Sequence, residues 1–154
     1  MSLQAESKPP LIGALLRIPW EVVHRRLLAE LHASGFTDLT AAHLTVMLYP
    51  AFEGQRPSDI AAQRGMSRQA INYILGQVEE LGYVERRGDP DDQRSKRIVL
   101  TPRGRNAGNV MRETVVAVER EWSDMMGAER FADLKRLLAD LGALAMPAST
   151  GERG

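Results

Sequence analysis

Residues 89–101 have the sequence DPDDQRSKRIVLT, and they directly follow the strand-like segment YVERR at residues 83–87. The Gly-Asp-Pro sequence at residues 88–90 favours a turn, because proline fixes φ and lacks an N–H while glycine and aspartate tolerate tight turns. These residues are expected to end the first strand, and the apolar residues 98–100 predict a return strand. The stretch therefore predicts a β-hairpin, with a charged tip that is longer than a minimal turn.

Two short helices are predicted immediately before this hairpin. Pro57 suits the first position of one helix, and Gly65 suits its end. Ser67 is a good N-cap for the second helix, whose apolar residues recur at helical spacing as far as a stop at Gly82. Two helices that are joined by a tight glycine-containing turn and followed by a hairpin predict a winged helix-turn-helix.

Helices are also predicted on both sides of this module. Apolar residues recur at helical spacing over residues 10–34, where Pro19 predicts a kink or a break. Thr101 and Pro102 suit the start of a long helix that Gly127 ends, and a last helix follows. These outer helices are too apolar for isolated surface helices, so they are expected to bury against each other or against a second subunit.

The expected fold is therefore mainly α, in a single domain over residues 1–154. A winged helix-turn-helix core with a two-stranded β-wing would span about residues 38–101. Dimerisation helices would flank it at about residues 10–34 and 102–145. A two-fold dimer would place two such modules one helical turn of DNA apart.

Charge is segregated along the chain, although the formal net charge is zero. Residues 56–105 contain ten Arg or Lys and seven Asp or Glu, a net charge of +3. Within residues 86–105 the balance is seven to three, so positive potential concentrates on the hairpin and its flanks. A local basic patch of this kind favours contact with phosphate, which is short-ranged at physiological salt.

The second helix of the pair is expected to be the recognition helix, because its apolar row faces the core and leaves a polar face outside. Arginine suits guanine, and asparagine or glutamine suits adenine. A bare helix N-terminus can also hold a phosphate through its N–H groups. The expected DNA-binding residues of this helix are Ser67, Arg68, Gln69, Asn72, Tyr73 and Gln77.

The hairpin supplies a second set of DNA-binding candidates, Arg94, Lys96 and Arg97. For Arg94 two roles remain open, insertion into the minor groove or internal pairing with Asp92. Asp92 lies two residues earlier and is expected to aim Arg94 rather than to bind DNA. Arg97 is the next expected phosphate or groove contact.

The segment from Leu39 to Arg105 resembles the winged-helix core of the multiple antibiotic resistance regulator (MarR) family. The matching features are the Leu-Thr helix start at residues 39–40, MSRQ at residues 66–69 and LGYVERR at residues 81–87. The DPDDQR wing and the Leu-Thr exit at residues 100–101 complete the set. The outer helices match that family in layout only.

This resemblance implies an obligate homodimer with interlocking terminal helices. It implies binding to a pseudo-palindromic DNA operator, usually as a repressor. It also implies release from DNA by a small aromatic or phenolic effector, which binds between the dimer helices and the DNA-binding lobe. Trp20, His24, His43 and Met47 are the candidates to line that pocket, and ordinary core packing is the alternative for all four.

Other function classes find little support. The chain contains no cysteine, which excludes disulfides, thiolate metal sites and thiol-based sensing. No histidine pair has the spacing of a helical metal site, and no catalytic or nucleotide-binding motif is present, so neither a metal nor an enzyme activity is expected. No export signal or membrane span is found, which leaves the cytoplasm as the expected compartment. The alternatives are a winged-helix protein-interaction module without DNA binding and a small enzyme with a histidine general base.

Overall fold

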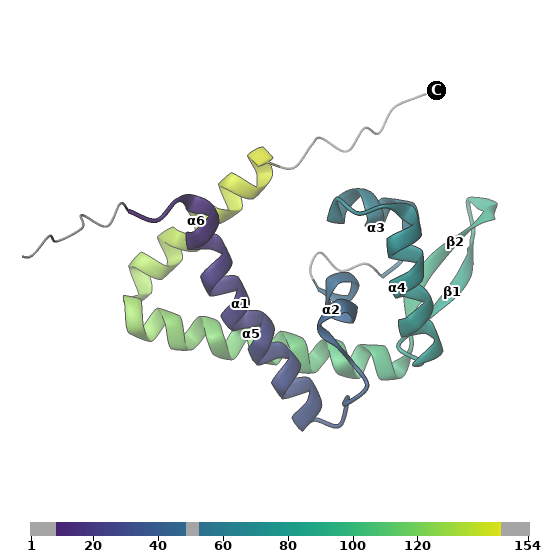
Figure 1. Cartoon of the computed structure of the whole chain (residues 1–154), viewed down its shortest axis with the longest axis horizontal. Coiled ribbons are helices and arrows are strands. Elements are labelled where there is room, and N and C mark those ends of the chain that lie inside the picture. The colour runs from purple at the N-terminus through teal and green to yellow at the C-terminus, as the bar shows by residue number, and fades with distance from the viewer. Residues whose placement is uncertain (1–8, 49–52, 146–154) are drawn as a thin grey trace, which may run out of the picture. The chain divides into compact units, whose positions relative to one another are not determined.

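The computed structural model describes residues 9–48 and 53–145, and it contains six helices and one β-hairpin in this part of the chain (Figure 1). The elements are α1 (Ile12–Ala33), α2 (Ala41–Met47), α3 (Pro57–Arg64), α4 (Arg68–Glu80), β1 (Val84–Asp89), β2 (Asp92–Leu100), α5 (Pro102–Met126) and α6 (Ala128–Ala145). The mainly α fold with a two-stranded wing is confirmed. Over the described ranges, no helix is long and apolar enough to cross a membrane.

The chain divides into two compact units, Met1–Val115 and Val116–Gly154. The first unit contains α1 to α4, the hairpin and the first half of α5. The second unit contains the rest of α5 and α6. Gly127, with a φ of 89° that suits glycine, separates these two helices as predicted.

Helices α3 and α4 form the predicted helix-turn-helix. Helix α3 begins with Pro57 and ends at Gly65, whose φ of 62° lies in the left-handed region that glycine adopts without strain. Helix α4 is capped by Ser67, whose Oγ accepts the N–H of Ala70 at 3.1 Å. Both helix ends therefore lie where the local sequence predicts them.

The core of the first unit lies behind α4. Four residues of α4 are buried in it, namely Ile71, Ile74, Leu75 and Val78. Their partners come from α1, the α2 region, α3 and the base of the hairpin, and include Leu27, Leu31, Leu39, Leu44, Val46, Ile60, Tyr83, Val84 and Ile98. Because one face of α4 is occupied in this way, its opposite face is left to solvent.

Strands β1 and β2 pair antiparallel around a turn of two residues, Pro90 and Asp91. Asp89 pairs with Asp92 across this turn, so β1 continues beyond Gly88. The turn itself has two residues, but residues 93–95 have no partner in β1, so the tip is longer than a minimal hairpin turn, as predicted. A register shift between Gly88 and Asp89 marks the irregularity that turns the side chain of Asp89 inward, where it is buried.

The segment before α3 lies along the second edge of β2. The N–H of Gly54 donates to the carbonyl of Ile98 at 2.6 Å, and the N–H of Ile98 donates to the carbonyl of Gln55 at 2.9 Å. These bonds satisfy backbone groups that β1 does not reach. The base of the wing is therefore attached to the chain that leads into the helix-turn-helix.

The sequence predicts a kink or a break at Pro19. Helix α1 is continuous through this residue, so the break is wrong, and the kink stays a prediction. Helix α5 begins as predicted, because Thr101 Oγ1 accepts the N–H of Gly104 at 3.0 Å and Pro102 is its first residue. At Gly104 a Cβ atom would overlap the backbone carbonyl of Tyr83. Glycine at this position therefore allows α5 to start against the base of the wing.

Candidate nucleic-acid interface

The exposed face of α4 carries the polar residues that the sequence predicts. Arg68, Gln69 and Asn72 are exposed, and Tyr73 is 68% exposed. Gln77 is half-buried, and its Nε2 donates to the hydroxyl of Tyr73 at 3.3 Å. The helix therefore presents donors, acceptors and one aromatic ring to solvent on a rigid, well-packed element.

The N-terminus of α4 adds a positive end to this face. Ser67 is exposed, but its Oγ is already used to cap the N–H of Ala70. The partial positive charge of the helix end lies beside the guanidinium-bearing Arg68. An anion at this end would meet both charges.

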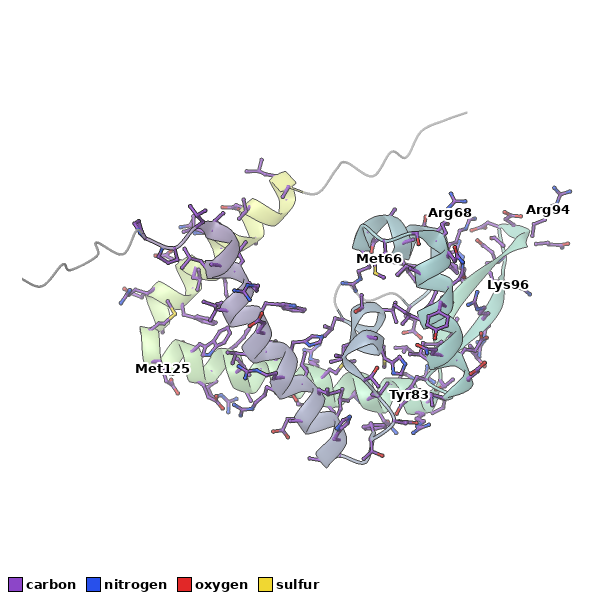
Figure 2. All side chains as sticks on the ribbon, viewed as in Figure 1. Met66, Arg68, Tyr83, Arg94, Lys96 and Met125 are labelled. Atoms are coloured by element: carbon purple, nitrogen blue, oxygen red, sulfur yellow. The ribbon has the colours of Figure 1, made fainter. Side chains whose placement is uncertain are left out.

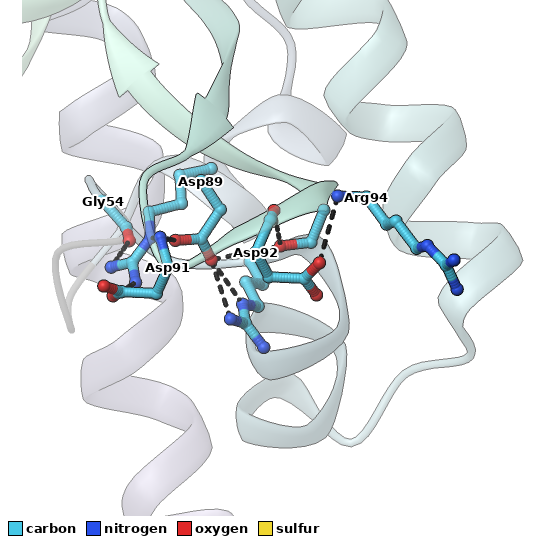
Figure 3. Close-up of polar contacts among 8 residues, drawn as sticks. Gly54, Asp89, Asp91, Asp92 and Arg94 are labelled. Carbon is cyan, nitrogen blue, oxygen red and sulfur yellow. Dashed lines mark hydrogen bonds and ion pairs between the residues drawn. The ribbon is translucent and has the colours of Figure 1, made fainter.

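A buried carboxylate holds the wing tip together, as Figure 3 shows. Asp89 is 3% exposed and accepts the N–H of Asp91 at 3.0 Å and the hydroxyl of Ser95 at 3.1 Å. It also receives Arg56 Nε at 2.8 Å and pairs with Arg97 Nε at 2.9 Å. Burial would raise the pKa of the Asp89 carboxyl, but these four partners together lower it well below its usual range.

Arg97 is engaged inside the wing. Besides Asp89, its guanidinium contacts Asp91 Oδ2 at 3.1 Å and the carbonyl of Gly54 at 3.2 Å. It thereby joins the turn of the hairpin to the segment that precedes α3. Its expected DNA contact stays a prediction, and the guanidinium has less freedom to reach a phosphate than an unpaired arginine has.

Arg94 and Asp92 interact through the backbone. Asp92 Oδ1 accepts the backbone N–H of Arg94 at 3.0 Å, while the guanidinium of Arg94 points away from the carboxylates of the tip (Figure 3). Of the two roles left open for Arg94, internal pairing of its guanidinium with Asp92 is not observed. Asp92 fixes the chain from which Arg94 projects.

The exposed cationic side chains of Arg68, Arg94 and Lys96 project from α4 and the wing (Figure 2). None of the three makes a hydrogen bond or ion pair with any other residue that the structure describes. Neighbouring cations differ, because Arg56 pairs with Asp89 at 2.8 Å and Arg87 donates to Glu85 at 2.7 Å. Ion pairs neutralise the charges of Arg56 and Arg87. The outward positive potential of α4 and the wing therefore comes mainly from the three unpaired cations.

Arg86 joins the wing to α4, a contact that the sequence reasoning missed. Its Nε donates to Glu79 Oε2 at 3.1 Å, and its Nη1 donates to Asn72 Oδ1 at 3.1 Å. Strand alternation places Arg86 and Arg87 on opposite faces of β1. Which of them meets α4 depends on how the hairpin packs.

A second polar cluster, also missed, fixes the base of the wing. The hydroxyl of Tyr83 donates to Asp38, and Arg103 pairs with the other oxygen of Asp38 at 2.9 Å. The guanidinium of Arg103 lies 4.4 Å from the centre of the Tyr83 ring. Burial, followed by the hydrogen bond to Asp38, raises the pKa of Tyr83. The cluster connects the chain before α2, the base of β1 and the start of α5.

The four residues expected to line an effector pocket are only partly brought together. Trp20 and His24 line an open hollow of about 310 Å³ with Glu21 and Arg25, all on α1, and their rings lie 5.6 Å apart. His43 and Met47 are buried in the core instead.

His43 serves α2, because its Nδ1 accepts the N–H of Thr40 at 3.1 Å and completes a capping box. Over residues 9–48 and 53–145, no group of three or more His, Asp or Glu side chains could hold a metal ion.

Comparison with known proteins agrees with this geometry. A family model described as MarR family matches residues 35–95, the segment that holds α2 to α4 and the wing tip. Residues 35–95 therefore resemble the DNA-binding lobe of MarR-family proteins. A search of curated proteins found no match to the chain. The matched residues exclude all of α1, α5 and α6, so the family match rests on the DNA-binding lobe.

Solved structures match this chain over most of its length. A MarR family transcription regulator is 29% identical, with 87% of this chain and 89% of that chain covered at a TM-score of 0.57. A Mycobacterium tuberculosis MarR family protein in complex with salicylic acid is 25% identical, with 89% and 98% covered at a TM-score of 0.62. Streptococcus pneumoniae FabT in complex with DNA is 22% identical, with 86% and 94% covered at a TM-score of 0.70. The protein thus has the winged-helix fold of MarR transcription regulators.

Proposed function

We propose that this protein binds a pseudo-palindromic DNA operator as a homodimer and represses transcription until a small aromatic effector releases it. The observation that carries the proposal is the set of three unpaired exposed cations on α4 and the wing, Arg68, Arg94 and Lys96. They lie on the two elements that a winged helix-turn-helix presents to a duplex.

In this proposal α4 enters the major groove. Arg68, Gln69, Asn72, Tyr73 and Gln77 then face base edges, and Ser67 lies at the helix end next to a phosphate. Arg94 and Lys96 extend from the wing toward the neighbouring backbone or minor groove. The DNA in the FabT structure supports this mode of use for the shared fold.

The dimer is supported by apolar surface that each unit leaves exposed. On α1, Leu11 is 83% and Ile12 is 61% exposed. On α6, Leu137 is 57% and Leu144 is 85% exposed. Long apolar side chains at this exposure favour burial against a second subunit. A two-fold dimer then spaces two α4 helices about 34–36 Å apart, one turn of the duplex.

The effector is proposed to be a small aromatic acid or phenol. The salicylic acid in the M. tuberculosis relative supports this class. On this chain, the hollow on α1 offers the rings of Trp20 and His24 and the cation of Arg25. To change operator occupancy about a hundredfold, a ligand must favour the non-binding spacing of the two heads by ~3 kcal/mol.

The proposal is tested by selecting duplexes from fragments of the source genome with the purified protein. Enriched fragments should share an inverted repeat with half-sites one helical turn apart, and salicylate should lower the affinity for them. Enrichment without any common repeat would contradict sequence-specific binding by a dimer.

The rival, a winged-helix protein-interaction module, predicts weak DNA association that barely depends on salt. The proposed regulator predicts a steep fall in affinity as salt rises, because phosphate contact releases counterions. A titration at several salt concentrations separates the two.

A further inference from the structure

We infer that Arg86 is a positioning residue for Asn72, and that it thereby sets which base is accepted at one position of each half-site. The inference rests on the proposed DNA-binding function and names a residue outside the groove-facing set. Arg86 lies on β1, whereas Asn72 lies on the exposed face of α4. The hydrogen bond between them, 3.1 Å from Nη1 to Oδ1, crosses from the wing to the recognition helix.

The chemistry of the pair decides the orientation of the Asn72 amide. A guanidinium has only donors, so the amide atom that faces Arg86 must be the oxygen. The NH₂ group of Asn72 makes no hydrogen bond within the ranges that the structure describes. It is therefore the part of the amide that remains to meet a base.

Glu79 keeps Arg86 in place. It lies seven residues after Asn72, two turns along α4, and its Oε2 accepts Arg86 Nε at 3.1 Å. The arginine side chain is 27% exposed and that of Glu79 is 38% exposed. The contacts of Glu79 and Asn72 with different nitrogens of the planar guanidinium restrict the rotation of Arg86. The amide of Asn72 is therefore already oriented in the free protein.

A donor in this position selects against one base. In the major groove adenine, guanine and thymine each present an acceptor, whereas cytosine presents its N4–H₂ donor. Asn72 held with its NH₂ outward therefore disfavours cytosine on the strand it contacts. An amide released from Arg86 can turn its oxygen outward and accept the cytosine donor, which weakens the discrimination.

The experiment uses the full chain and pools of duplexes randomised at each operator position. Asn72→Ala locates the position, because the base preference there disappears. The wild-type protein should disfavour cytosine about tenfold at that position, and Arg86→Gln should reduce this to about two- to threefold. Preferences at other positions should persist.

Arg87→Gln is the matched control. It removes the same charge from the next residue of β1, where Arg87 contacts Glu85 instead. It should change affinity for every sequence equally and leave the cytosine preference unchanged. In the Asn72→Ala background, Arg86→Gln should no longer alter any base preference, since it acts through Asn72.

The inference is overturned if Arg86→Gln keeps the wild-type cytosine discrimination while remaining folded by circular dichroism. It is equally overturned if the Arg86 effect survives in the Asn72→Ala background, or if Asn72→Ala changes no position. A wild-type protein that selects no sequence at all would refute the proposed function together with this inference.

Discussion

Removal of the Arg94 charge tests the proposed interface most directly. On α4 and the wing, Arg94 is one of three exposed cations, with Arg68 and Lys96, that pair with none of the described residues. A dimer presents six such charges. If each neutralises one phosphate, the slope of log affinity against log salt is about −5, a loss of roughly 10³-fold between 50 and 200 mM salt.

Arg94→Gln removes two of these six contacts from the dimer. The slope should then fall to about −3.5, and the loss of affinity over the same salt range should shrink to roughly 10²-fold. Fluorescence anisotropy of a labelled operator duplex at five or more salt concentrations measures both slopes. The affinity should fall for all sequences alike, because a phosphate contact carries no base information.

Arg112→Gln provides the control, since Arg112 is exposed on α5 and carries the same charge. Its slope should equal that of the wild type. An Arg94→Gln slope equal to the wild-type slope, in a protein that still folds, would refute the assignment of Arg94 to phosphate contact. A wild-type slope near zero would refute the reasoning that unpaired cations mark the interface.

Four further outcomes follow from the described contacts. Tyr83→Phe removes the hydroxyl that donates to Asp38 and should lower the free energy of unfolding by about 1.5–3 kcal/mol in urea titrations; no loss would mean that water replaces the bond. Gly104→Ala places a Cβ against a backbone carbonyl and should cost about 3 kcal/mol or more, seen as a lower Tm. The lowered pKa of Asp89 means that its carboxylate contributes stability above the ordinary value of 3.8 and loses it as pH falls through the folded value. The stability gap between the wild type and Asp89→Asn should thus stay constant near neutral pH and close only in acid; a gap that closes near pH 7 would contradict this sign. Leu141→Glu charges the exposed apolar row of α6 and should shift sedimentation toward monomer, whereas an unchanged dimer would place the subunit interface elsewhere.

Local chemistry explains why much of the fold could be predicted. A cap such as Ser67 or a left-handed glycine such as Gly65 acts within four residues of itself, so a single sequence contains the whole signal. The buried row of apolar residues on α4 is likewise a short-range pattern. It also predicts that the opposite, polar face of α4 is exposed. The break predicted at Pro19 is wrong for a different reason, since the helix continues despite the local preference of proline.

In the candidate site, too, local sequence predicts some features and long-range contacts decide the others. Sequence pattern placed Arg68, Arg94 and Lys96 on exposed elements, because exposure follows from helix and strand periodicity. It could not separate Arg94 from Arg97, since the difference lies in partners far along the chain. Arg97 meets Gly54, 43 residues away, and Asp89 meets Arg56, 33 residues away.

Pairing between residues so far apart in the sequence depends on how the hairpin packs against α3 and α4. Helix and strand periodicity does not predict this packing. The sequence therefore predicts the residue types on α4 and the wing. From these types it also predicts DNA as the partner. Which cations remain unpaired, and which asparagine is held by Arg86, was decided by tertiary contacts alone. The physical reason is that a charge acts through the groups that neutralise or orient it, and those groups become neighbours only when the chain folds.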